Sequence, residues 1–124
     1  FLPSAETFKI TTFNRATIEH RLRELAFLNS GVRIVLRDER PDSEYEVTLY
    51  FEGGLTEFVK YVDRAKNTLH PHPIILKTTV DGIGIEMALE WTDSYHETML
   101  CFTNNIPQKD GGTHLAGFRG ALTR

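Results

Sequence analysis

Residues 74–91 read IILKTTVDGIGIEMALEW, and this stretch gives the clearest indication of the fold class. Asp81-Gly82 lies between two apolar runs and is the strongest hairpin signal in the chain, because such a pair suits a tight two-residue turn. We expect a strand over Ile74–Val80 and a return strand over Ile83–Trp91. Alternate residues of the return strand share one face: Ile83, Ile85, Met87, Leu89 and Trp91 on one side, Glu86 and Glu90 on the other.

The residues before this hairpin predict a helix and a second hairpin. Asn14 can cap a helix whose apolar face is formed by Ile18, Leu22, Leu25 and Ala26, and Gly31 can end that helix in a left-handed conformation. The period then changes to two, so residues 32–51 predict a hairpin. A short helix is expected from Leu55 after the break at Gly53-Gly54.

The ends of the chain add three expected elements. Phe1–Ser4 reads as the tail of a strand that Pro3 stops, and Tyr95–Phe102 reads as a further strand. Gly111-Gly112 opens a last helix, with Thr113 as the expected cap. The expected order is β-α-β-β-α-β-β-β-α, which is an α+β fold.

Composition is that of one ordinary globular domain. The chain has 124 residues, of which 40% are hydrophobic and 25% charged, so it can bury a core. No stretch approaches the ~20 apolar residues that span a bilayer. Cys101 is the one cysteine, which excludes an internal disulfide framework and a cysteine-based zinc site. The absence of an initial methionine suggests a piece of something larger.

Charge is unevenly distributed along the chain. Residues 1–40 carry a net charge of +2, residues 41–100 carry −7, and residues 101–124 carry +2. A free-standing nucleic-acid binder usually presents a strongly basic face, which this chain as a whole does not. We therefore expect any phosphate contact to be local to the two ends.

Three possible chemical sites have simpler interpretations. His70-Pro71-His72 lacks further ligands in the local sequence, so a solvated loop is favoured over a metal site. Glu86 and Glu90 resemble an acid–base pair, but the polar outer face of a strand explains them equally well. Cys101 reads as a small buried hydrophobe between Leu100 and Phe102.

The polar tract from Phe102 to His114 is the most informative stretch for function. It joins a strand to a helix start, and the free N–H groups of a helix start can hold an anion. A tightly turned loop that only caps the helix is the competing interpretation, and composition alone favours it.

Two stretches closely resemble the gyrase B family of type IIA topoisomerases. They are residues 22–31 (LRELAFLNSG) and residues 101–119 (CFTNNIPQKDGGTHLAGFR). Residues 1–4, 50–54 and 81–84 fit the family as well, so the resemblance covers essentially the whole chain. The wording at Gln108-Lys109-Asp110 and Phe118-Arg119 resembles gyrase more than its topoisomerase IV counterpart, which stays an alternative.

The resemblance implies a fold and a place in a larger enzyme. Residues 1–30 would be the last strand and helix of a GHKL-type ATPase domain. Residues 31–124 would be the first part of a transducer domain, with a mixed β-sheet and a left-handed β-α-β crossover. The intact enzyme would use ATP and Mg, supercoil DNA negatively, and relay ATP-driven closure to the DNA gate. No residue here matches the family's ATP or magnesium ligands, so no catalytic, cofactor or metal residue is assigned to this piece.

The resemblance also implies partners and residue roles. The partners would be DNA, gyrase A and a second copy of gyrase B, in the cytoplasm and without a membrane. Arg119 and Arg124, with Lys109 behind them, are the expected DNA-facing charges. The loop and helix start would be built by Asn104, Asn105, Gly111, Gly112, Thr113 and His114, and His114 is expected to be buried and hydrogen-bonded. The rival interpretation is a catalytically inert structural or interaction module.

Overall fold

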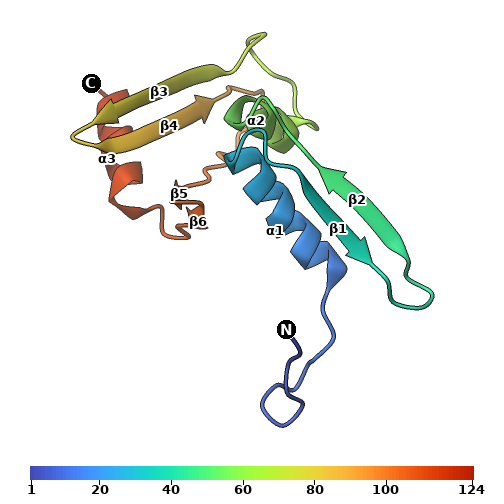
Figure 1. Ribbon diagram of the computed structural model, residues 1–124. Helices are drawn as coiled ribbons and strands as arrows, with labels where there is room; N and C mark the ends of the chain where they lie inside the picture. Colours follow the sequence, from blue (N-terminus) through green and yellow to red (C-terminus); the bar gives the residue numbers. More distant parts are fainter. The chain divides into compact units, whose positions relative to one another are not determined.

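The computed structural model describes residues 1–124, which form two compact units, Phe1–Phe58 and Val59–Arg124. Figure 1 labels three helices and six strands. In chain order they are α1 (Arg15–Leu28), β1 (Ile34–Asp38), β2 (Tyr45–Leu49), α2 (Leu55–Asp63), β3 (Ile74–Val80), β4 (Ile83–Leu89), β5 (Phe102–Thr103), β6 (Ile106–Pro107) and α3 (Gly112–Leu122). The α+β class is therefore confirmed.

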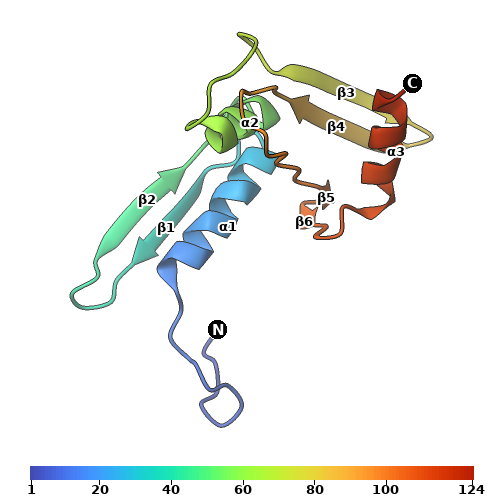
Figure 2. The ribbon, with the colours of Figure 1, turned by 180° about the vertical axis from the view of Figure 1, so that it is seen from behind.

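The first unit is a helix packed on a hairpin. Asn14 caps α1 as expected, because its Oδ1 accepts a hydrogen bond from the Thr17 N–H at 3.0 Å. Strands β1 and β2 pair antiparallel, with Ile34 opposite Leu49 and Asp38 opposite Tyr45. The two views in Figures 1 and 2 agree that α1 runs alongside this hairpin.

The first unit also holds every buried hydrophobic side chain of the chain. They are Ala26, Phe27, Leu49 and Phe58. The Phe27 ring stacks on the Phe51 ring with centroids 3.7 Å apart and on the Phe58 ring at 5.0 Å. The core thus lies where the end of α1, the exit from β2 and the first turn of α2 meet.

The second unit contains the longest hairpin. Strands β3 and β4 pair over seven residues each, from Ile74↔Leu89 to Val80↔Ile83. Asp81 and Gly82 take positive φ angles of 51° and 78°, which confirms the predicted turn. All seven residues of β3 are exposed, so this hairpin is held by backbone pairing more than by a core.

Three expectations about strands are wrong. Residues 1–14 contain no strand, since no other segment of this chain pairs with Phe1–Ser4. The strand expected over Tyr95–Phe102 is reduced to β5, and the return strand ends at Leu89 rather than Trp91. Backbone hydrogen bonds for these residues require a neighbouring strand in register, which the sequence pattern does not supply.

The mixed sheet and its left-handed crossover are also not formed by this chain. Every strand pair is antiparallel, in three separate two-stranded sheets, β1-β2, β3-β4 and β5-β6. A β-α-β crossover needs a parallel pair, but β2 pairs with β1 and β3 pairs with β4. Each strand finds its partner in the neighbouring sequence, which favours local hairpins.

None of the helices is both long enough and apolar enough to cross a lipid bilayer.

Candidate nucleic-acid interface

The polar tract after Cys101 contains a tight hairpin that the sequence interpretation missed. Strands β5 and β6 pair through Phe102↔Pro107 and Thr103↔Ile106. Asn104 and Asn105 form the turn with φ angles of 48° and 66°. Asparagine tolerates this left-handed region better than most residues, so the Asn-Asn pair between Thr103 and Ile106 was the available signal.

Gly111 positions the start of α3. It is buried, its φ is 81°, and it is the N-cap residue, with no side-chain hydrogen bond to the helix. A Cβ at this position would lie 2.2 Å from Leu115 Cδ2, so only glycine fits. The expectation that Thr113 caps the helix is wrong, because the helix already begins at Gly112.

His114 and Cys101 are less buried than expected. His114 is exposed and makes no hydrogen bond, so the interpretation of a buried, hydrogen-bonded histidine is wrong. The first turn of α3 leaves this side chain in contact with solvent. Cys101 is half-buried rather than enclosed, because the strand expected around it is not formed.

The three expected DNA-facing cations differ in their surroundings. The Arg119 guanidinium pairs with the Glu97 carboxylate, with Nη2 and Oε1 2.6 Å apart. Both side chains are more than half exposed, so water screens this pair. Lys109 and Arg124 are exposed and form no ion pair. The sequence carried no signal for Glu97, which lies in an irregular segment between β4 and β5.

The loop 67–73 is fastened to the chain after β4. The Trp91 N–H donates to His70 Nε2 at 2.9 Å, so the His70 proton is on Nδ1, which donates to the His72 carbonyl at 2.7 Å. Asn67 donates to Asp93 through its side chain at 2.7 Å. His70 thus organises a loop, and no group of three or more potential metal-binding side chains occurs in the structure.

The two glutamates considered as an acid–base pair have separate environments. Glu86 pairs with Lys77 across the β3–β4 hairpin. Glu90 follows β4, and its Oε2 is buried without a hydrogen-bond partner. The arrangement matches a polar strand face for Glu86, whereas Glu90 has an environment of its own.

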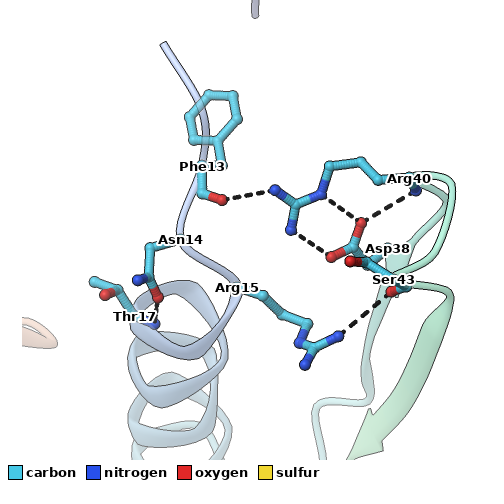
Figure 3. A network of polar contacts seen from close by, with 7 residues as sticks. All are labelled: Phe13, Asn14, Arg15, Thr17, Asp38, Arg40 and Ser43. Atoms are coloured by element: carbon cyan, nitrogen blue, oxygen red, sulfur yellow. Dashed lines mark hydrogen bonds and ion pairs between the residues drawn. The ribbon is translucent and has the colours of Figure 1, made fainter. Parts of the chain in front are cut away.

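A polar network joins the start of α1 to the turn between β1 and β2 (Figure 3). The Arg40 guanidinium donates to both Asp38 carboxylate oxygens and, at 3.0 Å, to the Phe13 carbonyl. Arg15 donates to the Ser43 carbonyl at 3.4 Å and stacks on the Tyr45 ring. The hydrogen bonds from Arg40 lower the pKa of Asp38 to about 2. The network therefore fastens α1 to the hairpin at the end opposite the core.

Curated relatives match the chain over its whole length. The B subunit of DNA gyrase from Caulobacter vibrioides is 57% identical over 124 residues, which are 100% of this chain and 15% of that protein. The B subunit of DNA gyrase from Rickettsia felis is 56% identical over 125 residues, which cover 100% of this chain and 16% of that protein. The chain thus spans about one sixth of the length of these relatives.

Two solved structures share the fold. The B-subunit of the DNA gyrase from Myxococcus xanthus superimposes with a TM-score of 0.89 and 30% identity, over 98% of this chain and 39% of that chain. The 43K ATPase domain of Thermus thermophilus gyrase B, solved in complex with an aminocoumarin, gives a TM-score of 0.82 and 31% identity, over 96% of this chain and 32% of that one.

The family itself is shown by a model match that covers more than half of the chain. The model described as DNA gyrase B matches residues 54–124, which include β3, β4 and the whole candidate interface. The relatives above carry the gyrase B name, so the topoisomerase IV alternative is not favoured. The chain belongs to the DNA gyrase B family.

Proposed function

We propose that this chain works as a segment of gyrase B in an ATP-dependent type II topoisomerase that negatively supercoils DNA. Its role is to relay the ATP-driven closure of a gyrase B dimer to the DNA gate. The observation that carries the proposal is the match of all 124 residues to gyrase B relatives at 57% identity. The helix fastened to a hairpin at both ends suits a part that transmits movement.

The proposal includes the division of the chain and its partners. Residues 1–30 belong to the end of the ATPase domain and residues 31–124 to the start of the transducer. ATP and Mg are bound by other parts of gyrase B. The partners are DNA, gyrase A and a second copy of gyrase B, and the enzyme works in the cytoplasm.

The proposed DNA-facing residues are Arg119, Arg124 and Lys109, each as a phosphate contact without base readout. Their exposure supports this role, since a phosphate can reach all three side chains. Arg119 already holds a carboxylate oxygen, and a phosphate oxygen is the chemically equivalent acceptor. The remaining residues of the tract shape the turn and the helix start beside these cations: Asn104, Asn105, Gly111, Gly112, Thr113 and His114.

The test is the salt dependence of DNA binding by full-length gyrase B assembled with gyrase A. The Arg119→Ala variant is expected to bind DNA more weakly and to reduce the slope of log K against log salt by about 1. Supercoiling and DNA-stimulated ATP hydrolysis fall with it. Arg37→Ala is the matched control, because Arg37 is an equally exposed arginine that is paired with Glu46.

An unchanged salt slope for Arg119→Ala would remove the assignment of this arginine. Glu97→Gln tests the same point from the opposite side. Loss of the carboxylate charge frees Arg119, so DNA binding at low salt is expected to strengthen. Weaker binding by Glu97→Gln would contradict the proposed contact.

A further inference from the structure

The junction between α1 and α2 is the most tightly built part of the chain. Three segments meet there, and each provides one ring of an aromatic stack: Phe27 from α1, Phe51 from the exit of β2 and Phe58 from α2. Phe27 is 2% exposed and Phe58 is 7% exposed. A ring held between two others cannot turn or slide without moving both neighbours, because protein cores are close-packed.

Two hydrogen bonds tie the end of α1 to the exit of β2 beside this stack. The Gly31 N–H donates to the Phe51 carbonyl at 3.2 Å. The Ser30 hydroxyl donates to the Glu52 carbonyl. The backbone of residues 30–31 is therefore held against residues 51–52 at two successive positions.

The next residues connect the same junction to α2. The Gly53 N–H donates to the Glu57 carboxylate at 2.9 Å, which caps the start of α2. Gly54 is buried with a φ of 55°, and a Cβ there would lie 3.4 Å from Ser30 Cβ and 3.7 Å from the Phe27 carbonyl oxygen. The absence of a side chain at Gly54 lets the two helix ends approach closely.

We propose that this junction is the coupling joint of the segment, in which Ser30, Gly54 and the stack of Phe27, Phe51 and Phe58 pass a movement of α1 on to α2. The inference rests on the proposed relay function and assigns it to particular residues. The proposed domain boundary between residues 30 and 31 falls inside the joint, so α1 reaches the joint from one domain. α2 leaves it and continues the chain into the other. These are positioning residues, since none of them touches nucleotide or DNA.

The experiment measures the number of supercoils introduced per ATP hydrolysed, in full-length gyrase B assembled with gyrase A. Ser30→Ala removes the hydroxyl that donates to Glu52 and leaves the aromatic stack in place. The ratio of supercoils to ATP is expected to fall about fivefold, the size of one lost hydrogen bond. The KM for ATP is expected to stay unchanged, because no residue of the joint binds nucleotide. A loss of stability alone would not change this ratio.

Two matched variants complete the design. Ser30→Thr keeps the hydroxyl and is expected to retain the parent ratio. Ser43→Ala removes a serine hydroxyl that makes no hydrogen bond, at the opposite end of the hairpin, and is expected to do the same. An unchanged ratio in Ser30→Ala, or an equal fall in Ser30→Thr, would overturn the joint. A parent protein without ATP-dependent supercoiling would instead contradict the proposed function, so the two failures are distinguishable.

Discussion

The two compact units of the chain differ in where their apolar side chains lie. All four buried hydrophobic side chains belong to the first unit, at the junction of α1, β2 and α2. The second unit has none, and its longest hairpin exposes apolar residues such as Ile74 and Ile83 to about half or more of their area. One unit is therefore held by a core and the other by backbone pairing and polar contacts.

It follows that equivalent side-chain changes should not have the same effect in both units. Removing buried atoms loses both the transfer free energy and the packing around them. Removing half-exposed atoms loses only part of the first contribution. The variants below compare matched positions in the two units, and each could contradict the contrast.

The largest effect is expected for Phe27→Ala. Its ring is stacked between two others, so the free energy of unfolding should fall by about 3–5 kcal/mol. Urea-induced unfolding, followed by near-ultraviolet signals of the first unit, measures this loss. The matched variant is Leu76→Ala in β3, which is 41% exposed and should lose far less. Equal losses would show that the two units do not differ in this way.

A smaller effect is expected for Gly54→Ala, with Gly82→Ala as its partner in the second unit. Both glycines have positive φ angles, 55° and 78°, so each alanine adds backbone strain of about 1–2 kcal/mol. Only the Cβ at Gly54 also meets packed atoms, whereas nothing lies within 4 Å of a Cβ at Gly82. Chemical denaturation should thus show the greater loss for Gly54→Ala. The reverse order would mean that the junction is loosely packed.

The third effect depends on pH and concerns the network at the other end of α1. The pKa of Asp38 is about 2 in the folded chain, below its ordinary value of 3.8. A lowered pKa stabilises the fold above about pH 4, and this stabilisation disappears as the pH falls through about 2. Unfolding measured between these pH values should lose part of its pH dependence in Asp38→Asn. An identical pH profile for parent and variant would show that the ion pair with Arg40 does not stabilise the fold.

The smallest effect is expected for Ile85→Ala in β4. This side chain is 44% exposed, so its truncation should change the free energy of unfolding by less than about 1 kcal/mol. Amide hydrogen exchange of β3 and β4 provides the local measurement. A loss as large as that of Phe27→Ala would mean that the hairpin is covered in solution.

Elements that rest on local chemistry were predictable from the sequence. The Asn14 cap, the Asp81-Gly82 turn and the helix from Leu55 were confirmed, because each depends on residues a few positions apart. The β5–β6 hairpin was missed although Asn104-Asn105 signalled it, since only the glycine-containing turn was recognised. The strand at Phe1–Ser4 was wrong, because a strand also needs a partner.

The candidate interface was predictable only in part. The tract from Phe102 to Arg119 identified the region, and the family resemblance identified its meaning. The pairing of Arg119 with Glu97 was not predictable, because the two residues are 22 positions apart and share no periodic element. The roles of Arg119, Arg124 and Lys109 at DNA stay predictions.

Short-range chemistry along the chain was enough to specify the hairpins, the helix cap and the family, because turns and residue spacing act over a few positions. The convergence of Phe27, Phe51 and Phe58 and the contact of Ser30 with Glu52 became visible only in the folded chain. No period in the sequence marks these residues, since their burial depends on how three separate segments pack against one another.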